Sequence, residues 1–132
     1  STEGSLMAVL VDTSVWIDYF RSGRQSEKLD FLIDENIVAV NELILTELVP
    51  FLKVRRQNRV VDLLYSITRL QLAIDWAEIM DFQLKCLKSG INGIGISDLI
   101  IVQNARQHGS EIYSFDSHFK QLEKLLSLKL TA

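Results

Sequence analysis

Four acidic residues occupy positions where a lone carboxylate is unusual: Asp12, Glu47, Asp98 and Asp116. Two of them directly follow segments that read as strands, one is the single charge in the apolar window ILTELVPF, and one begins a helix. Carboxylates that converge without a lysine or arginine nearby repel each other, and oxygen-only sites of this kind suit Mg²⁺ or Mn²⁺. Such ions serve phosphoryl displacement, because they polarise the phosphate and lower the pKa of a bound water.

Each acid also has a simpler explanation. Asp12, Asp98 and Asp116 are residues that cap helices, and Glu47 is explained equally well as a surface residue that reaches solvent. Taken singly, the two explanations are about equally good. The sequence favours a shared site because four such coincidences are less probable together than any one of them.

The elements that must position these acids alternate between strands and helices. Strands are predicted at 8–11, 37–40, 69–74, 111–115 and, at the sheet edge, 127–131. Helices are predicted at 13–20, 26–36, 41–56, 58–67, 75–90, 97–109 and from 116 onward, with Asn41 and Asp75 expected to cap the helices that they begin. This alternation predicts a parallel α/β sheet with right-handed crossovers. Asp12 and Asp116 then leave the carboxyl ends of strands, where ligands bind in such sheets.

Two helices carry specific expectations. Pro50 should kink the helix at 41–56 or end it early, since proline deletes a hydrogen bond to the preceding turn. Along 75–90, the stripe of Trp76, Met80, Leu84 and Leu87 predicts packing against the core. Cys86 lies close to that stripe and is also expected in the core.

The bulk properties describe an ordinary globular domain. The chain has 132 residues, a net charge of −3 and one cysteine. We expect residues 1–6 to be an appended remnant, with Met7 as the natural start and one domain over 7–132. The single cysteine excludes an intramolecular disulfide and, without a signal-peptide pattern, predicts a cytoplasmic protein. No apolar run approaches the ~18 residues that span a bilayer, so no membrane association is expected.

Four segments resemble a known family. VDTSVWID, LTELV, SDLIIVQNA and YSFDSHF resemble the PIN-domain ribonucleases and, within them, the VapC-type toxins of bacterial toxin–antitoxin pairs. The resemblance spans nearly the whole chain. It implies a single PIN-like domain whose parallel five-stranded sheet has the order 3-2-1-4-5 and is flanked by helices. It also implies endoribonuclease activity that depends on Mg²⁺ or Mn²⁺ and leaves a 5′-phosphate and a 3′-hydroxyl.

The resemblance assigns residues as well. Asp12, Glu47, Asp98 and Asp116 fall on the four acidic positions that hold metal and carry catalysis. Thr13 or Ser14 falls where the family often places a hydroxyl near the metal. His118 departs from the pattern, because many members carry another acid or a basic residue there. The implied partners are an RNA substrate, a cognate antitoxin and a second copy of the chain, with a dimer interface near Pro50 where Trp16, Val49 and Phe51 are expected to be exposed.

Other residues leave alternatives open. Lys53, Arg55, Arg56 and Arg59 form either an RNA or partner contact beside Glu47 or a solvated helix face. His118 is either a proton shuttle or a surface histidine. For the whole chain, the alternative to a ribonuclease is a catalytically inactive PIN-fold module that binds RNA or protein.

Overall fold

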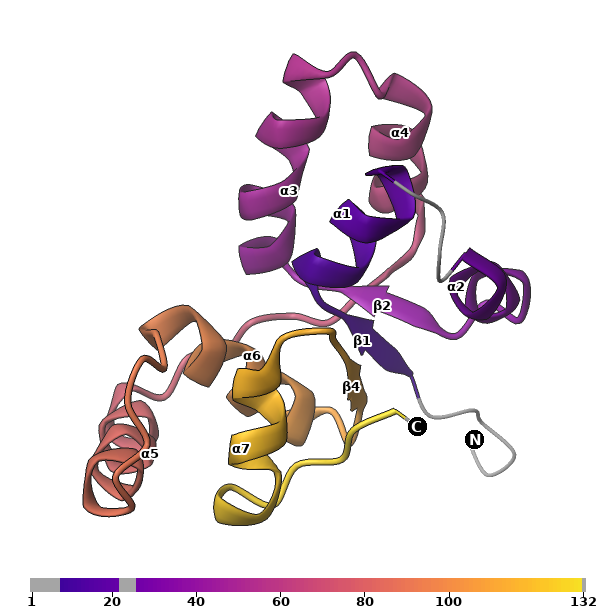
Figure 1. Ribbon diagram of the computed structural model, residues 1–132. Helices are drawn as coiled ribbons and strands as arrows, with labels where there is room; N and C mark the ends of the chain where they lie inside the picture. Colours follow the sequence, from indigo (N-terminus) through magenta and orange to yellow (C-terminus); the bar gives the residue numbers. More distant parts are fainter. Residues whose placement is uncertain (1–7, 22–25, 132) are drawn as a thin grey trace.

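The computed structural model describes residues 8–21 and 26–131 (Figure 1). The predictions that residues 1–6 are a remnant and that Met7 is the natural start fall outside the described residues. The described chain contains four strands and seven helices.

The sheet is parallel throughout and has the order β3-β2-β1-β4. Its strands are β1 (Val9–Val11), β2 (Val38–Val40), β3 (Thr68–Arg69) and β4 (Glu111–Tyr113). The residues of β1 and β2 are all buried, as expected for strands covered on both faces. The α/β class and the order of the first four strands are therefore confirmed.

The predicted fifth strand is wrong in extent. At the expected place beside β4, the chain makes a single parallel bridge between Ile112 and Leu130. The backbone N–H of Leu128 still bonds to Glu123 of the preceding helix at 3.1 Å, so pairing with β4 begins only at Lys129. The result is four strands and one bridge in place of five strands.

The strand predicted at 69–74 is also wrong beyond its first residue. The N–H of Leu70 makes the last bond to β2, at 2.8 Å to the carbonyl oxygen of Val40. Farther along, side-chain amides bind the backbone carbonyls of this segment, with Asn104 donating to Gln71 and Gln107 donating to Ala73. These bonds replace the ladder that a longer strand would have made.

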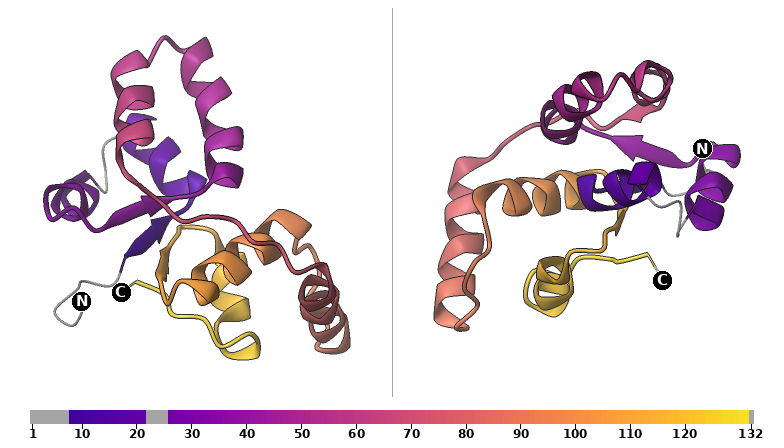
Figure 2. Two further views of the ribbon diagram at one scale, coloured as in Figure 1. Left: turned by 180° about the vertical axis from the view of Figure 1, so that it is seen from behind. Right: turned by 45° about the horizontal axis from the view of Figure 1, so that its top comes forward.

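Helices fill both faces of the sheet. They are α1 (Thr13–Arg21), α2 (Ser26–Asp34), α3 (Glu42–Val54), α4 (Asn58–Ser66), α5 (Trp76–Lys88), α6 (Ile96–Gln107) and α7 (Ser117–Leu125). In Figure 1, α1, α3 and α4 lie above the strands, whereas α6 and α7 lie below. Both views in Figure 2 place α5 at the periphery, where it packs against α6.

Helix α3 continues past Pro50 to Val54, so proline does not end it. Leu48 and Leu52 on either side of the proline are fully buried. Packing against the core therefore holds both halves of the helix in place despite the missing hydrogen bond.

The prediction that the apolar stripe of α5 packs against the core is wrong. Trp76, Met80, Leu84 and Leu87 are between 49% and 67% exposed. The buried face consists of Ile79, Phe82 and Cys86, which also recur at helical spacing, and the prediction that Cys86 is in the core is confirmed. Both faces of the helix are apolar, so its outer position decides which one is buried.

Two apolar side chains that were predicted to be exposed near Pro50 are buried. Trp16 is fully buried and its indole N–H donates to the carbonyl oxygen of Val11 at 3.2 Å, while Val49 is 6% exposed. Phe51 is partly buried.

In residues 8–21 and 26–131, no helix is long and apolar enough to cross a membrane.

A buried amide pair links the two layers of helices. The side-chain amide of Asn41 donates to Asn104 Oδ1 at 2.9 Å, and Asn41 Oδ1 accepts the N–H of Ile44, which caps α3 as predicted. Asn104 in turn donates to the carbonyl of Gln71 at 3.1 Å. Both asparagines are almost completely buried, so these bonds have no water to replace them.

We predict that Asn104→Leu lowers the free energy of unfolding by about 2–4 kcal/mol, because it leaves the Asn41 amide and a backbone carbonyl unpaired in the core. The matched control is Gln107→Leu in the same helix, whose exposed amide donates to the neighbouring carbonyl of Ala73. That variant should lose about 1 kcal/mol or less. Urea melts of the three proteins measure the difference, and equal losses would contradict a structural role for the buried pair.

Candidate active site

The four acids all lie at the carboxyl edge of the sheet. Asp12 follows β1 directly, and Asp116 caps α7 after β4. Asp98 is in the first turn of α6, and Glu47 lies in α3, which begins after β2. The parallel topology therefore gathers residues that are up to 104 positions apart in the sequence, counting from 12 to 116.

Two of these acids meet a histidine. His118 Nδ1 lies 3.2 Å from Asp98 Oδ2 and 3.4 Å from Asp116 Oδ1. One donor atom from each of the three residues lies within 4.8 Å of the others. Burial raises the pKa of the Asp98 carboxyl and Asp116 raises it further, whereas the hydrogen bonds from His118 and from the Gly95 amide lower it.

Glu47 is joined to the same charges from the side of α3. Its Oε1 accepts the hydroxyl of Thr13 at 3.1 Å. Although the residue is exposed overall, partial burial of its carboxyl group raises the pKa. The hydrogen bond from Thr13 lowers the pKa of Glu47, whereas the charges of Asp12 and Asp98 raise it further. Glu47 therefore interacts electrostatically with these two acids.

Asp12 is 7% exposed and is held by two serine hydroxyls. Its Oδ2 accepts Ser14 Oγ at 2.9 Å and Ser114 Oγ at 2.8 Å. Ser114 Oγ also accepts the backbone N–H of Asp116 at 3.0 Å, so one serine joins the turn after β1 to the turn after β4. Sequence reasoning missed Ser114, and its place directly after β4 and two residues before Asp116 is the signal that was available.

The donor set fits a hard divalent cation. Asp98, Asp116 and His118 already lie close enough to share one ion, and Glu47 interacts electrostatically with Asp98 and Asp12. The described residues place no lysine or arginine in an ion pair with any of the four predicted acids. Carboxylate oxygens without a competing cation are the ligands that Mg²⁺ and Mn²⁺ prefer.

Comparison with known proteins identifies the family. The family model described as "PIN domain" matches residues 9–125. The chain belongs to the PIN domain family. A search of curated proteins found no significant match.

Solved structures share the fold of this PIN domain at low sequence identity. DNA-bound VapBC from Salmonella typhimurium is 14% identical, with a TM-score of 0.73 over 96% of this chain and 98% of that one. VapBC2 from Rickettsia felis, bound to a promoter DNA fragment, is 17% identical, with a TM-score of 0.75 over 95% and 98%. FitAcB from Neisseria gonorrhoeae is 20% identical, with a TM-score of 0.67 over 94% and 96%.

The predicted basic patch lies away from the acids. Lys53, Arg55, Arg56 and Arg59 are all exposed at the turn from α3 to α4, which Figure 1 shows at the far end of that helical pair from the sheet. Arg55 is eight residues beyond Glu47, or about 12 Å along a helix. The Arg55 guanidinium stacks on the Phe51 ring at 3.7 Å, and none of the four makes a salt bridge with another described residue.

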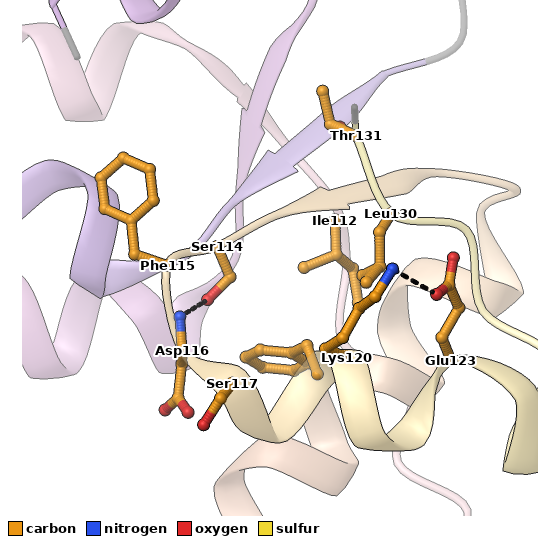
Figure 3. A pocket seen from close by; sticks show the side chains of 10 residues that line it. Ile112, Ser114, Phe115, Asp116, Ser117, Lys120, Glu123, Leu130 and Thr131 are labelled. Atoms are coloured by element: carbon orange, nitrogen blue, oxygen red, sulfur yellow. Dashed lines mark hydrogen bonds and ion pairs between the residues drawn. The ribbon is translucent and has the colours of Figure 1, made fainter.

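A cavity of about 430 Å³ opens on the other side of Asp116, between α7, β4 and the chain near Leu130 (Figure 3). Lys120 lines it and pairs with Glu123 at 3.2 Å. In Figure 3 the Asp116 carboxylate points away from Leu130 and Thr131. The cavity contains none of the other three acids, so it borders the acidic cluster and is separate from it.

We predict that Asp98→Asn is as stable as the native protein or more stable in chelator at pH 7, by about 0.5–2 kcal/mol. The pKa of Asp98 is raised in the folded protein, so the folded protein binds the carboxyl proton of Asp98 more tightly than the unfolded chain does. The stabilising contribution of that proton is present at low pH and is lost as pH rises above the ordinary value of 3.8. The advantage of asparagine should therefore appear as pH rises and vanish in acid.

Urea melts between acid and neutral pH, run in chelator and in saturating Mg²⁺, measure this difference. Bound metal should reduce or reverse the stability difference between Asp98→Asn and the native protein, since only the native protein gains the full free energy of metal binding. Asp75→Asn is the matched control, because Asp75 also caps a helix but lies outside the cluster. A variant at Asp98 that is clearly less stable in chelator would show that this residue is a structural cap.

Proposed function

We propose that this PIN domain is a metal-dependent endoribonuclease that acts as the toxin of a toxin–antitoxin pair. The observation that carries the proposal is the convergence of Asp98 and Asp116 within 4.8 Å at the carboxyl edge of the sheet. Glu47 interacts electrostatically with Asp98 and Asp12, and Ser114 joins Asp12 to the turn that bears Asp116. The fold neighbours support the second part, since several are solved as VapBC or other toxin–antitoxin complexes.

Asp12, Glu47, Asp98 and Asp116 would hold Mg²⁺ or Mn²⁺ through their carboxylate oxygens. A bound ion of this kind polarises the phosphate and lowers the pKa of a water. The hydroxyls of Thr13 and Ser14 donate hydrogen bonds to Glu47 and Asp12 and so orient these two carboxylates. The products would be RNA ends with a 5′-phosphate and a 3′-hydroxyl.

The alternative is an inactive PIN-fold module that binds RNA or protein. Such a module has no need to hold acids that raise one another's pKa, as Asp116 does to Asp98 and as Asp12 does to Glu47. The persistence of that repulsion favours the enzyme. A cleavage assay separates the two.

We predict that the purified protein cleaves single-stranded or loop RNA only when Mg²⁺ or Mn²⁺ is added. Glu47→Gln and Asp116→Asn should each lower the rate by at least about 100-fold, because each removes a charged ligand and keeps the shape of the side chain. The matched control is Glu78→Gln in α5, an acid outside the cluster. Cleavage that persists in excess chelator, or the absence of cleavage of any total cellular RNA, would refute the enzyme.

The proposed partners are a cognate antitoxin that reaches the acidic site with a cation and a second copy of this chain. The dimer proposal near Pro50 loses two of its supports, since Trp16 and Val49 are buried. Val54, at 80% exposed, and Tyr65, at 53%, remain on the surface of α3 and α4. We further propose a cytoplasmic location, on the cysteine content alone.

We predict a dimer at micromolar concentration that Val54→Asp weakens, because a charge in an apolar interface is costly to desolvate. Met80→Asp on the exposed face of α5 is the matched control, since Met80 is 67% exposed and lies on a different helix. Light scattering after gel filtration measures both variants. A monomeric native protein would contradict the dimer, and dissociation by Met80→Asp alone would move the interface to α5.

A further inference from the structure

One histidine stands among the carboxylates. His118 Nδ1 faces Asp98 Oδ2 at 3.2 Å and Asp116 Oδ1 at 3.4 Å, and the imidazole is about one-third exposed. Asp98 is the less exposed of the two acids, at 17% of its side chain. The proposed chemistry assigns all metal binding to carboxylates and gives this ring no part.

The spacing of these atoms suits ligands of one ion. Neighbouring ligands of an octahedral ion at 2.1 Å are about 3.0 Å apart, since their directions are at right angles. The two distances from Nδ1 exceed that value by only a few tenths of an ångström. The two carboxylate oxygens lie within 4.8 Å of each other, which is near the separation of about 4.2 Å for ligands on opposite sides of such an ion. Small side-chain rotations would therefore bring one nitrogen and two oxygens to a common ion.

The ring is held so that Nδ1 is the nitrogen that faces the acids. The backbone N–H of His118 donates to Asp116 Oδ1 at 2.9 Å, which ties the first turn of α7 to its cap. On the opposite edge, a Cβ built on Gly93 would lie 3.9 Å from Nε2, so the loop before α6 passes along that side of the ring. Nδ1 donates to Asp98 when it carries the ring proton, whereas a neutral imidazole protonated at Nε2 would offer its Nδ1 lone pair to an ion.

We propose that His118 Nδ1 is a metal ligand together with Asp98 and Asp116, and that it shifts the preference of the site from Mg²⁺ toward Mn²⁺. The inference rests on the proposed function, because it concerns the ion of that same site. Mg²⁺ binds oxygen almost exclusively, whereas a first-row transition ion also accepts imidazole nitrogen. A site with one nitrogen donor therefore binds Mn²⁺ with a more favourable free energy, relative to Mg²⁺, than a site made of oxygen alone.

The competing explanation is that His118 only hydrogen-bonds to Asp98 and orients it. In that case the ion contacts oxygen alone. Substitution of the ring would then weaken the binding of both ions by a similar factor.

The test uses the purified full chain with MnCl₂ and MgCl₂. Pulsed electron paramagnetic resonance of bound Mn²⁺ detects a directly coordinated imidazole through its ¹⁴N coupling. The chain has two histidines, so His108→Asn is the matched control: His108 is exposed at the end of α6. We expect ¹⁴N coupling in the native protein and in His108→Asn, and none in His118→Asn.

Calorimetric titration then measures affinity. His118→Asn should weaken Mn²⁺ binding by about tenfold or more and Mg²⁺ binding by a smaller factor. Bound Mn²⁺ without ¹⁴N coupling in the native protein, or an equal loss of affinity for both ions, would overturn the proposal, and the first of these needs no variant to fold. Failure of the ribonuclease looks different: ¹⁴N coupling with no metal-dependent RNA cleavage refutes the enzyme and leaves the ligand in place.

Discussion

The site depends on one constraint, which is the repulsion between carboxylates gathered at the carboxyl edge of the sheet. Asp116 disfavours the charged form of Asp98, and Asp12 and Asp98 disfavour that of Glu47. Each acid has its own donor. Two serine hydroxyls hold Asp12, Thr13 holds Glu47, and the amide of Gly95 holds Asp98 together with His118. Asp116 accepts the N–H of His118 at the start of α7. These local hydrogen bonds fix the position of each carboxylate.

The elements that carry the acids are tied to one another at a second level. Asn41 caps α3, which bears Glu47, and bonds to Asn104 of α6, which bears Asp98. Ser114 joins the turns that carry Asp12 and Asp116. Because these links are buried or partly buried, a shift of one acid-bearing element disturbs another. The site is thus a property of the packed sheet and helices rather than of a single loop.

The periphery follows different rules. Helix α5 buries Ile79, Phe82 and Cys86 and leaves a second apolar stripe in solvent, and the turn after α3 gathers basic side chains away from the acids. These surfaces are not needed to hold the site together.

The sequence by itself determined the parallel α/β class and the helix caps at Asn41, Asp75 and Asp116. Both follow from local signals, namely buried apolar runs that alternate with helical patterns, and capping side chains at the helix starts. The order of the first four strands came from the resemblance to the PIN-domain ribonucleases. The sequence also indicated which acids share one edge of the sheet. Only the tertiary structure decided which apolar stripe of α5 is buried, that the segment after Arg69 gives its carbonyls to α6, and that the last strand is a single bridge. It alone placed His118 between two carboxylates and Ser114 against Asp12, because such contacts depend on how elements distant in the chain pack together.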